Sequence, residues 1–203
     1  HALGVVDALM YPDTQAFMRF QLPTRLPESV QARALDVARR FLQAVGFTHG
    51  LFNMEFFYND VTDELKVIEF NPRMASQFSD LYRQVTGVCL HALSLALAHN
   101  RDPAHVRRHT PTAGAAASFV HRVFDPLAPV SMPTAAQMTA FASAFPVGLV
   151  MPFPKSAGSI ARDFKWLGSY RFGIVHLAGA TQADMLARYR AACATLGWPA
   201  LAG

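Results

Sequence analysis

The order of apolar and polar residues in the first part of the chain predicts two strands followed by a helix. Residues 3–10 and 16–22 are extended apolar segments, separated by a turn that contains Pro12 and Asp13. After Pro23 and Pro27, apolar residues recur every three to four positions from about residue 28. This spacing predicts an amphipathic helix that ends at Gly46, a residue suited to a helix C-terminus.

The next two strand patterns, residues 51–58 and 65–70, predict a β-hairpin around a polar turn. With the turn centred on Thr62, residues equally far from Thr62 pair across the hairpin. Glu55 then faces Glu69, and Asn53 faces Asn71, all on one side because side chains alternate along a strand. The opposite side carries the apolar residues Phe52, Met54, Phe56, Ile68 and Phe70. We therefore expect one core face and one face of two carboxylates and two amides.

The rest of the pattern predicts a mixed α+β chain with a division near its middle. A helical stretch runs from about residue 77 to 98, with a break at Gly87, and the polar segment 101–112 is the best candidate for a linker. Beyond it we expect strands at 115–124, 147–151 and 166–177, a loop at 152–158, and helices at 134–144 and 183–196. The predicted units are residues 1–100, the linker 101–112, and residues 113–203.

Composition narrows the classes of protein. The chain of 203 residues is 52% hydrophobic and 16% charged, which excludes intrinsic disorder. No apolar run reaches the ~20 residues that a membrane-spanning helix needs. The two cysteines make neither a disulfide framework nor a zinc site, so a reducing, cytoplasmic location is expected.

The basic residues do not indicate a nucleic-acid surface. The formal net charge is +4, and most of the positive charge comes from arginines scattered along the chain. A mildly basic protein that handles anionic small molecules fits this charge equally well. Because the sequence opens on His1 and enters a strand pattern at once, we expect that an upstream half is missing.

The polar face of the hairpin carries the chemistry. Directly opposed glutamates repel one another, whereas two carboxylates and an amide offer the hard oxygen ligands that Mg²⁺ takes. Glu55, Glu69 and Asn71 are therefore candidate metal ligands; the alternative is a shifted register that leaves two unrelated surface glutamates. Arg73 follows at once and is suited to bind phosphate or carboxylate, or else to pair with one of the glutamates.

These residues carry a family resemblance. The glutamate of the first strand, followed by Ile68-Glu69-Phe70-Asn71-Pro72-Arg73, resembles the C-terminal lobe of the ATP-grasp superfamily, which includes biotin carboxylases and ATP-dependent carboxylate–amine ligases. The resemblance covers about residues 1–100 and extends more weakly to residues 168–179 and the last helix. It implies an α+β fold, namely an antiparallel sheet with helices packed on it plus a small α/β C-terminal subdomain, without the N-terminal lobe.

The resemblance also implies a function. Glu55, Glu69 and Asn71 would hold Mg²⁺ (or Mn²⁺) on the phosphates of ATP, and Arg73 would steady an acyl-phosphate formed from a carboxylate substrate and passed to an amine. The chain would be part of a ligase, inactive and weak in ATP binding without its N-terminal lobe, and a homodimer is one candidate assembly. The alternatives are a biotin carboxylase-like enzyme that phosphorylates bicarbonate, and a binding module that has lost the chemistry.

A few other residues are weaker candidates. Where many relatives carry a glycine-rich substrate loop, this chain has residues 74–78, and Ser76 and Gln77 there either bind substrate or, as we favour, cap the next helix. Tyr170 and Arg171 lie at a strand edge that could approach a substrate, and Lys155 is comparable. His176, inside a predicted strand, is expected to be a structural histidine and not a catalytic base. No histidines share metal-ligand spacing on one predicted element.

Overall fold

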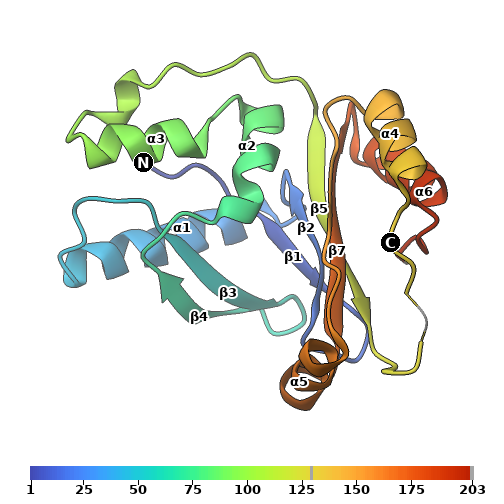
Figure 1. Ribbon diagram of the computed structural model, residues 1–203. Helices are drawn as coiled ribbons and strands as arrows, with labels where there is room; N and C mark the ends of the chain where they lie inside the picture. Colours follow the sequence, from blue (N-terminus) through green and yellow to red (C-terminus); the bar gives the residue numbers. More distant parts are fainter. Residues whose placement is uncertain (129, 202–203) are drawn as a thin grey trace.

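A five-stranded antiparallel sheet forms the centre of the molecule, in the order β1-β2-β5-β7-β6 (Figure 1). The computed structural model describes residues 1–128 and 130–201. The strands of this sheet are β1 (Asp7–Met10), β2 (Phe17–Leu22), β5 (Ala115–Val123), β6 (Leu149–Pro152) and β7 (Tyr170–Gly179). A separate two-stranded sheet is the hairpin of β3 (Asn53–Asn59) and β4 (Glu64–Asn71). The α+β fold class with an antiparallel sheet is confirmed.

Helices cover both faces of the central sheet. The hairpin lies with α1, α2 and α3 on one side, whereas α4 and α6 lie on the other (Figure 1). The helices are α1 (Glu28–Ala44), α2 (Ser79–Thr86), α3 (Leu90–Ala98), α4 (Ala135–Ala144), α5 (Ala157–Leu167) and α6 (Gln182–Leu196), with short 3₁₀ turns at Ser76–Phe78 and Pro103–His105. The molecule therefore has three layers, and the candidate site belongs to the layer that contains α2.

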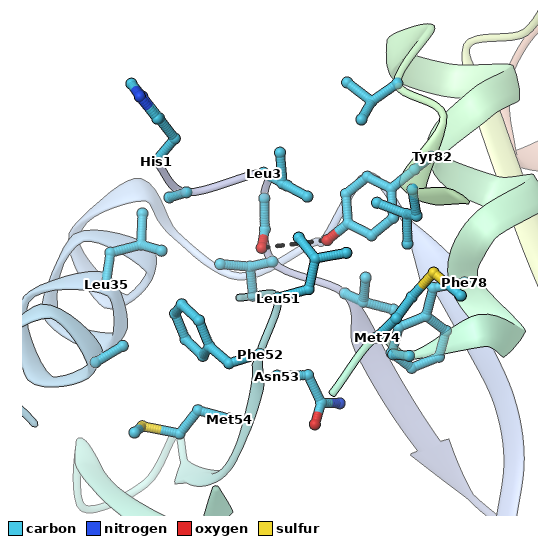
Figure 2. Close-up of a pocket in the computed structure, with 18 of the residues that line it drawn as sticks. His1, Leu3, Leu35, Leu51, Phe52, Asn53, Met54, Met74, Phe78 and Tyr82 are labelled. Atoms are coloured by element: carbon cyan, nitrogen blue, oxygen red, sulfur yellow. Dashed lines mark hydrogen bonds between the residues drawn. The ribbon is translucent and has the colours of Figure 1, made fainter. Parts of the chain in front are cut away.

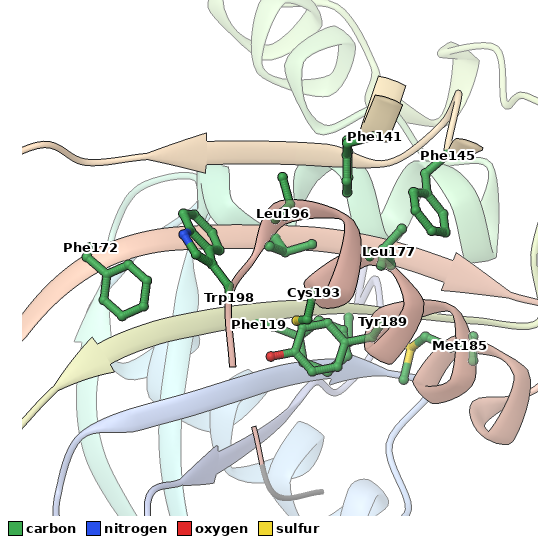
Figure 3. Close-up of a cluster of buried hydrophobic side chains, with 14 of the residues drawn as sticks. Phe119, Phe141, Phe145, Phe172, Leu177, Met185, Tyr189, Cys193, Leu196 and Trp198 are labelled. Carbon is green, nitrogen blue, oxygen red and sulfur yellow. The ribbon is translucent and has the colours of Figure 1, made fainter. Parts of the chain in front are cut away.

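The main core fills the space between the sheet and α6. Alternate residues of β5 point into it, and the ring of Phe119 stacks on that of Tyr189 with centroids 3.6 Å apart (Figure 3). Trp198, which follows α6, closes one end of this core and donates a hydrogen bond from its indole nitrogen to the carbonyl of Ser131 (3.0 Å). On the opposite face of β5, Ala116 packs with the buried Leu81 of α2.

The central sheet takes strands from both halves of the chain, because β2 pairs with β5. The segment between α3 and β5 is also attached to α2. The backbone N–H groups of His109 and Thr112 donate to the carbonyls of Gly87 (2.8 Å) and Gln84 (2.9 Å). Division of the chain into two units at residues 101–112 stays a prediction. The central sheet contains strands from before and after this segment.

Two expected elements differ from those observed. Residues 157–167 form α5, a helix that the sequence pattern did not predict. It takes only the end of the expected loop at 152–158 and the start of the expected strand at 166; Ser156 caps it, and Gly168 ends it in a left-handed conformation. The apolar residues Trp166 and Leu167 mimic a strand in the sequence, but they are exposed at the end of this helix. The first strand is also shorter than expected and covers only Asp7–Met10.

Among the described residues, no helix is both long and apolar enough to cross a lipid bilayer.

Candidate functional site

The hairpin has the expected register where the candidate ligands lie. Asn53 pairs with Asn71, and Glu55 pairs with Glu69. Immediately beyond Glu55 the register shifts by one residue, so that Phe56 faces Val67. The bulge is confined to the part of the hairpin nearer the turn, and it leaves the two carboxylates directly opposed on one face.

A line of polar contacts follows the end of β4. The side-chain amide of Asn71 donates to the Glu69 carboxylate (2.7 Å), and its carbonyl oxygen accepts from the Arg73 guanidinium (3.4 Å). Among the described residues, Arg73 has no carboxylate within 4 Å. The alternative in which Arg73 forms an ion pair with a glutamate is therefore not what the structure shows, and the guanidinium is exposed beside Asn71.

Electrostatics at the site disfavour two charged carboxylates. Burial raises the pKa of Glu55 above its usual range, and the neighbouring Glu69 raises it further, while the positive charge of Arg73 acts in the opposite direction. Glu69 is exposed, whereas Glu55 is half-buried. A cation between the two would relieve their repulsion. The side-chain oxygen of Asn53, on the same face, is buried and has no hydrogen-bond partner among the residues that the structure describes.

Aromatic packing holds the other face of the hairpin. The ring of Phe70 lies 5.0 Å from that of Phe41 on α1, and 5.6 Å and 5.7 Å from those of Phe47 and Phe52. An isolated two-stranded hairpin is marginally stable in water, so this packing against α1 is what fixes the position of the polar face.

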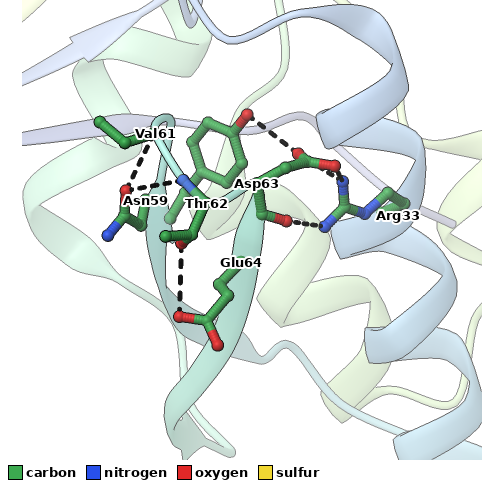
Figure 4. A network of polar contacts seen from close by, with 7 residues as sticks. Arg33, Asn59, Val61, Thr62, Asp63 and Glu64 are labelled. Atoms are coloured by element: carbon green, nitrogen blue, oxygen red, sulfur yellow. Dashed lines mark hydrogen bonds and ion pairs between the residues drawn. The ribbon is translucent and has the colours of Figure 1, made fainter.

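A second attachment lies at the turn of the hairpin (Figure 4). The guanidinium of Arg33 on α1 binds the carboxylate of Asp63 at 2.7 Å and also donates to the Asp63 carbonyl (2.7 Å). Tyr58 donates to the same carboxylate (3.1 Å), and the side chain of Asn59 accepts from the backbone N–H groups of Val61 and Thr62. The hairpin is thus attached to α1 at two places: Phe70 packs on Phe41, and Asp63 of the turn binds Arg33.

A large groove of about 1430 Å³ opens beside the hairpin, and both Asn53 and Glu55 line it. Most of its other lining is apolar and comes from the N-terminal segment, α1, the hairpin and α3, with Tyr82 of α2; Leu3, Leu35, Phe52 and Tyr82 are labelled in Figure 2. Arg101, Arg107 and Arg108, from the segment after α3, also line the groove. Of the polar residues on this face of the hairpin, Asn53 and Glu55 therefore border an apolar groove large enough for a small-molecule ligand.

The donor set fits a hard divalent cation. No group of three or more His, Cys, Asp or Glu side chains gathers among the described residues. Two opposed carboxylates and amide oxygens, one of them buried without a partner, are nevertheless the kind of set with which proteins hold Mg²⁺ when substrate phosphates and water complete the shell. The oxygen atoms of the site thus fit Mg²⁺ or Mn²⁺ that is held jointly by the protein and by substrate phosphates.

The expectation that Ser76 or Gln77 caps the following helix is wrong. The residue before α2 is Phe78, and no side chain caps either α2 or the preceding turn. Gln77 instead donates a hydrogen bond to the hydroxyl of Ser118 on β5 (2.9 Å), and Ser118 is fully buried. The segment after Arg73 is thereby attached to the central sheet, a contact between residues 41 positions apart that no local pattern indicates.

The remaining candidates have other partners. Tyr170 is buried in the core against Phe164, and Lys155 is paired with Asp163 of α5. His176 is buried, with its Nδ1 3.7 Å from the carboxylate of Asp80. Arg171 lies opposite Arg122. Arg122 was not among the residues predicted for a site. The one sequence signal for Arg122 is a charged residue inside an otherwise apolar strand pattern.

Comparisons with known proteins are consistent with this geometry. No protein-family model matches the chain, and no curated protein matches it significantly. Solved structures do match: urea amidolyase from K. lactis has a TM-score of 0.62 at 18% identity, over 94% of this chain and 11% of that one.

Two further solved structures are similar. N5-carboxyaminoimidazole ribonucleotide synthetase from Thermus thermophilus has a TM-score of 0.61 at 14% identity, over 95% of this chain and 45% of that one. Biotin carboxylase from Campylobacter jejuni has a TM-score of 0.61 at 13% identity, over 96% and 42%. The chain thus spans less than half the length of each of these three structures. The likeness to these structures confirms the α+β fold that the resemblance implies.

Proposed function

We propose that this chain, which has the fold of the C-terminal lobe of ATP-grasp enzymes, is the metal- and phosphate-binding part of an ATP-dependent ligase. In the proposed reaction a carboxylate substrate attacks the γ-phosphate of ATP, and the resulting acyl-phosphate is transferred to an amine. The observation that carries the proposal is the opposition of Glu55 and Glu69 across the hairpin, in line with Asn71 and Arg73.

Each residue has a role that follows from its place. Glu55, Glu69 and Asn71 would hold Mg²⁺ or Mn²⁺, which neutralises charge on the transferred phosphoryl group. Arg73 has no carboxylate partner among the described residues, and its permanently charged guanidinium would bind the oxygens of a phosphate. Asn53 adds a buried acceptor on the same face.

The groove supports a nucleotide as the ligand. Its apolar lining is suited to a flat base, while Glu55 lies at its edge, where phosphates and metal would meet. Among the similar structures, the biotin carboxylase was solved as a β,γ-ATP complex and an N5-carboxyaminoimidazole ribonucleotide synthetase as an ADP complex. These ligands are those of the solved proteins, and we extend them to this chain as part of the proposal.

A carboxylase is the second candidate. Urea carboxylase and biotin carboxylase are both among the similar structures, which favours bicarbonate as the group that is phosphorylated. Release of ADP by the full-length parent protein, measured with carboxylate–amine pairs and with bicarbonate plus biotin, separates the two reactions. A non-catalytic binding module would release ADP with neither.

The direct test is Mn²⁺ binding by the chain, followed by electron paramagnetic resonance. Glu69→Gln keeps the shape of the side chain but removes a charged ligand, and we expect at least ~10-fold weaker binding. Because burial and Glu69 raise the pKa of Glu55, the native chain should also lose Mn²⁺ as the pH falls, starting at a higher pH than for ordinary carboxylates.

The matched control is Glu64→Gln, on the same hairpin. Glu64 is exposed and lies 3.3 Å from the Lys66 ammonium, away from the opposed carboxylates. This variant removes the same charge, so we expect unchanged Mn²⁺ affinity. Equal affinities of the native chain and Glu69→Gln would rule out the metal assignment.

A further inference from the structure

Two arginines face each other directly on adjacent strands of the central sheet. Arg122 of β5 pairs with Arg171 of β7, just beyond a bulge. Side chains of such a pair leave the sheet on the same face with Cβ atoms ~5 Å apart, and like charges at this separation are destabilising. The repulsion between the two arginines therefore lowers the stability of the fold unless an anion binds between them.

The pair faces the same side of the sheet as the contacts of α2. Along β5, Ser118 and Arg122 are four residues apart and therefore point to one face, with Ser118 in contact with Gln77. The strand rise places Arg122 about 13 Å further along from that contact. The hairpin and α2 lie on this side, opposite to α4 and α6 (Figure 1).

Neither guanidinium has a carboxylate within 4 Å in the described parts of the chain. Arg122 donates to the hydroxyl of Ser169 (3.1 Å), and its Nε is buried with no hydrogen-bond partner in residues 1–128 and 130–201. Arg171 lies over the ring of Phe153, 4.7 Å from its centroid. These neutral contacts orient the two side chains without neutralising them.

The acid that acts on Arg122, Asp163, is already paired with other side chains. Asp163 of α5 is bound by Lys155, and the guanidinium of Arg162 lies 4.0 Å from it. Burial and the charge of Arg171 both lower the pKa of Arg122, whereas the charges of Tyr11 and Asp163 act in the opposite direction. Positive charge around the pair therefore exceeds what this one carboxylate can balance.

The backbone at this position is held firmly. The hydroxyl of Tyr11 donates to the carbonyl of Val120 (2.8 Å) and accepts from the backbone N–H of Arg122 (3.2 Å). The two half-buried guanidinium groups are therefore presented from a fixed strand pair, which favours bidentate recognition of an oxyanion.

We propose that Arg122 and Arg171 together bind an anionic group of the substrate, a carboxylate or a phosphate separate from the carboxylate that is activated. Binding of the oxyanion depends only on the arginine pair, whereas its assignment to a substrate rests on the proposed ligase function. The substrate class is then an acid with two anionic groups, one held at the arginine pair and one presented for phosphorylation.

The experiment is a titration of the chain with succinate and, separately, with inorganic phosphate, followed by the ¹⁵N–¹H signals of arginine Nε. We expect saturable shifts of the Arg122 and Arg171 signals, and the tighter of the two probes identifies carboxylate or phosphate. Loss of one charge-assisted contact in Arg171→Gln should weaken binding at least ~10-fold. This variant also removes the repulsion, so its melting temperature should be no lower than that of the native chain.

The matched control is Arg190→Gln, which removes the same charge from the exposed surface of α6 on the other side of the sheet. Its affinity for either probe should equal that of the native chain. Absence of saturable shifts, or equal affinities of the native chain and Arg171→Gln, would overturn the proposal.

Mn²⁺ binding measured on the same samples separates this inference from the proposed function. Mn²⁺ bound at the hairpin without an oxyanion at the arginines overturns the inference alone. An oxyanion at the arginines without Mn²⁺ binding supports the anion site and overturns its assignment to a ligase substrate.

Discussion

At the scale of single residues, His121 shows how burial shapes a side chain's chemistry. It is fully buried on β5, where its Nε2 lies 3.1 Å from the hydroxyl of Tyr189 and its Nδ1 has no hydrogen-bond partner. Burial lowers the pKa of this histidine from 6.5 to about 4. The folded protein therefore keeps His121 neutral at pH values at which the unfolded chain protonates it.

This shift predicts a loss of stability in acid. Between pH 6.5 and about 4 the unfolded chain binds a proton that the folded chain does not, so the free energy of unfolding falls as the pH falls through this window. The contribution is at most about 3 kcal/mol. Urea unfolding at several pH values should show a weaker pH dependence for His121→Gln, whereas His91→Gln, at an exposed position, should keep the native dependence. Parallel curves for native protein and His121→Gln would contradict the assignment.

At the scale of elements, Gly87 joins α2 to the segment before β5. It ends α2 with a φ of +72°, and a Cβ built there would lie 1.9 Å from the carbonyl oxygen of His109. That carbonyl belongs to backbone, which cannot move aside as a flexible side chain can. The helix break expected at Gly87 is therefore a left-handed turn that packs against the backbone of His109.

We expect Gly87→Ala to lower the free energy of unfolding by about 2 kcal/mol or more, since it combines a left-handed conformation with a steric clash. Gly158 offers the matched control, because it lies in α5 with open space around the position of a Cβ. Gly158→Ala should be neutral or stabilising by up to ~1 kcal/mol. Thermal unfolding of both variants checks this, and equal melting temperatures would argue against the contact with His109.

At the scale of the whole molecule, the central sheet couples the two halves of the sequence. Trp198 packs against Gly173 of β7 so closely that a Cβ on Gly173 would lie 2.3 Å from the indole ring. β7 pairs with β5, and β5 pairs with β2. A change at the C-terminal end of the core is therefore connected through the sheet to strands near the N-terminus.

Trp198→Ala should lower the free energy of unfolding by about 3–5 kcal/mol, the range for loss of a buried large aromatic side chain. Hydrogen exchange should show reduced protection in β7 and also in β2, because both belong to one sheet. Unchanged protection of β2 would instead favour independent units on either side of residues 101–112. Trp166→Ala, at an exposed position on α5, should change stability by no more than ~0.5 kcal/mol.

Features that depend on neighbours along the chain could be predicted from the order of residues alone. The register of Glu55 opposite Glu69 follows from alternation about one short turn, and the ends of α1 and α6 follow from residues adjacent to them. Two local features were not predicted. The bulge at Phe56 has no signal in the alternation of residues, and the apolar residues at the end of α5 resemble the start of a strand. Only the tertiary structure decided the pairs that are distant in sequence: Gln77 with Ser118, and Arg122 with Arg171. Strands that no short turn joins find their register through the packing of side chains over the whole sheet, and no local pattern records that.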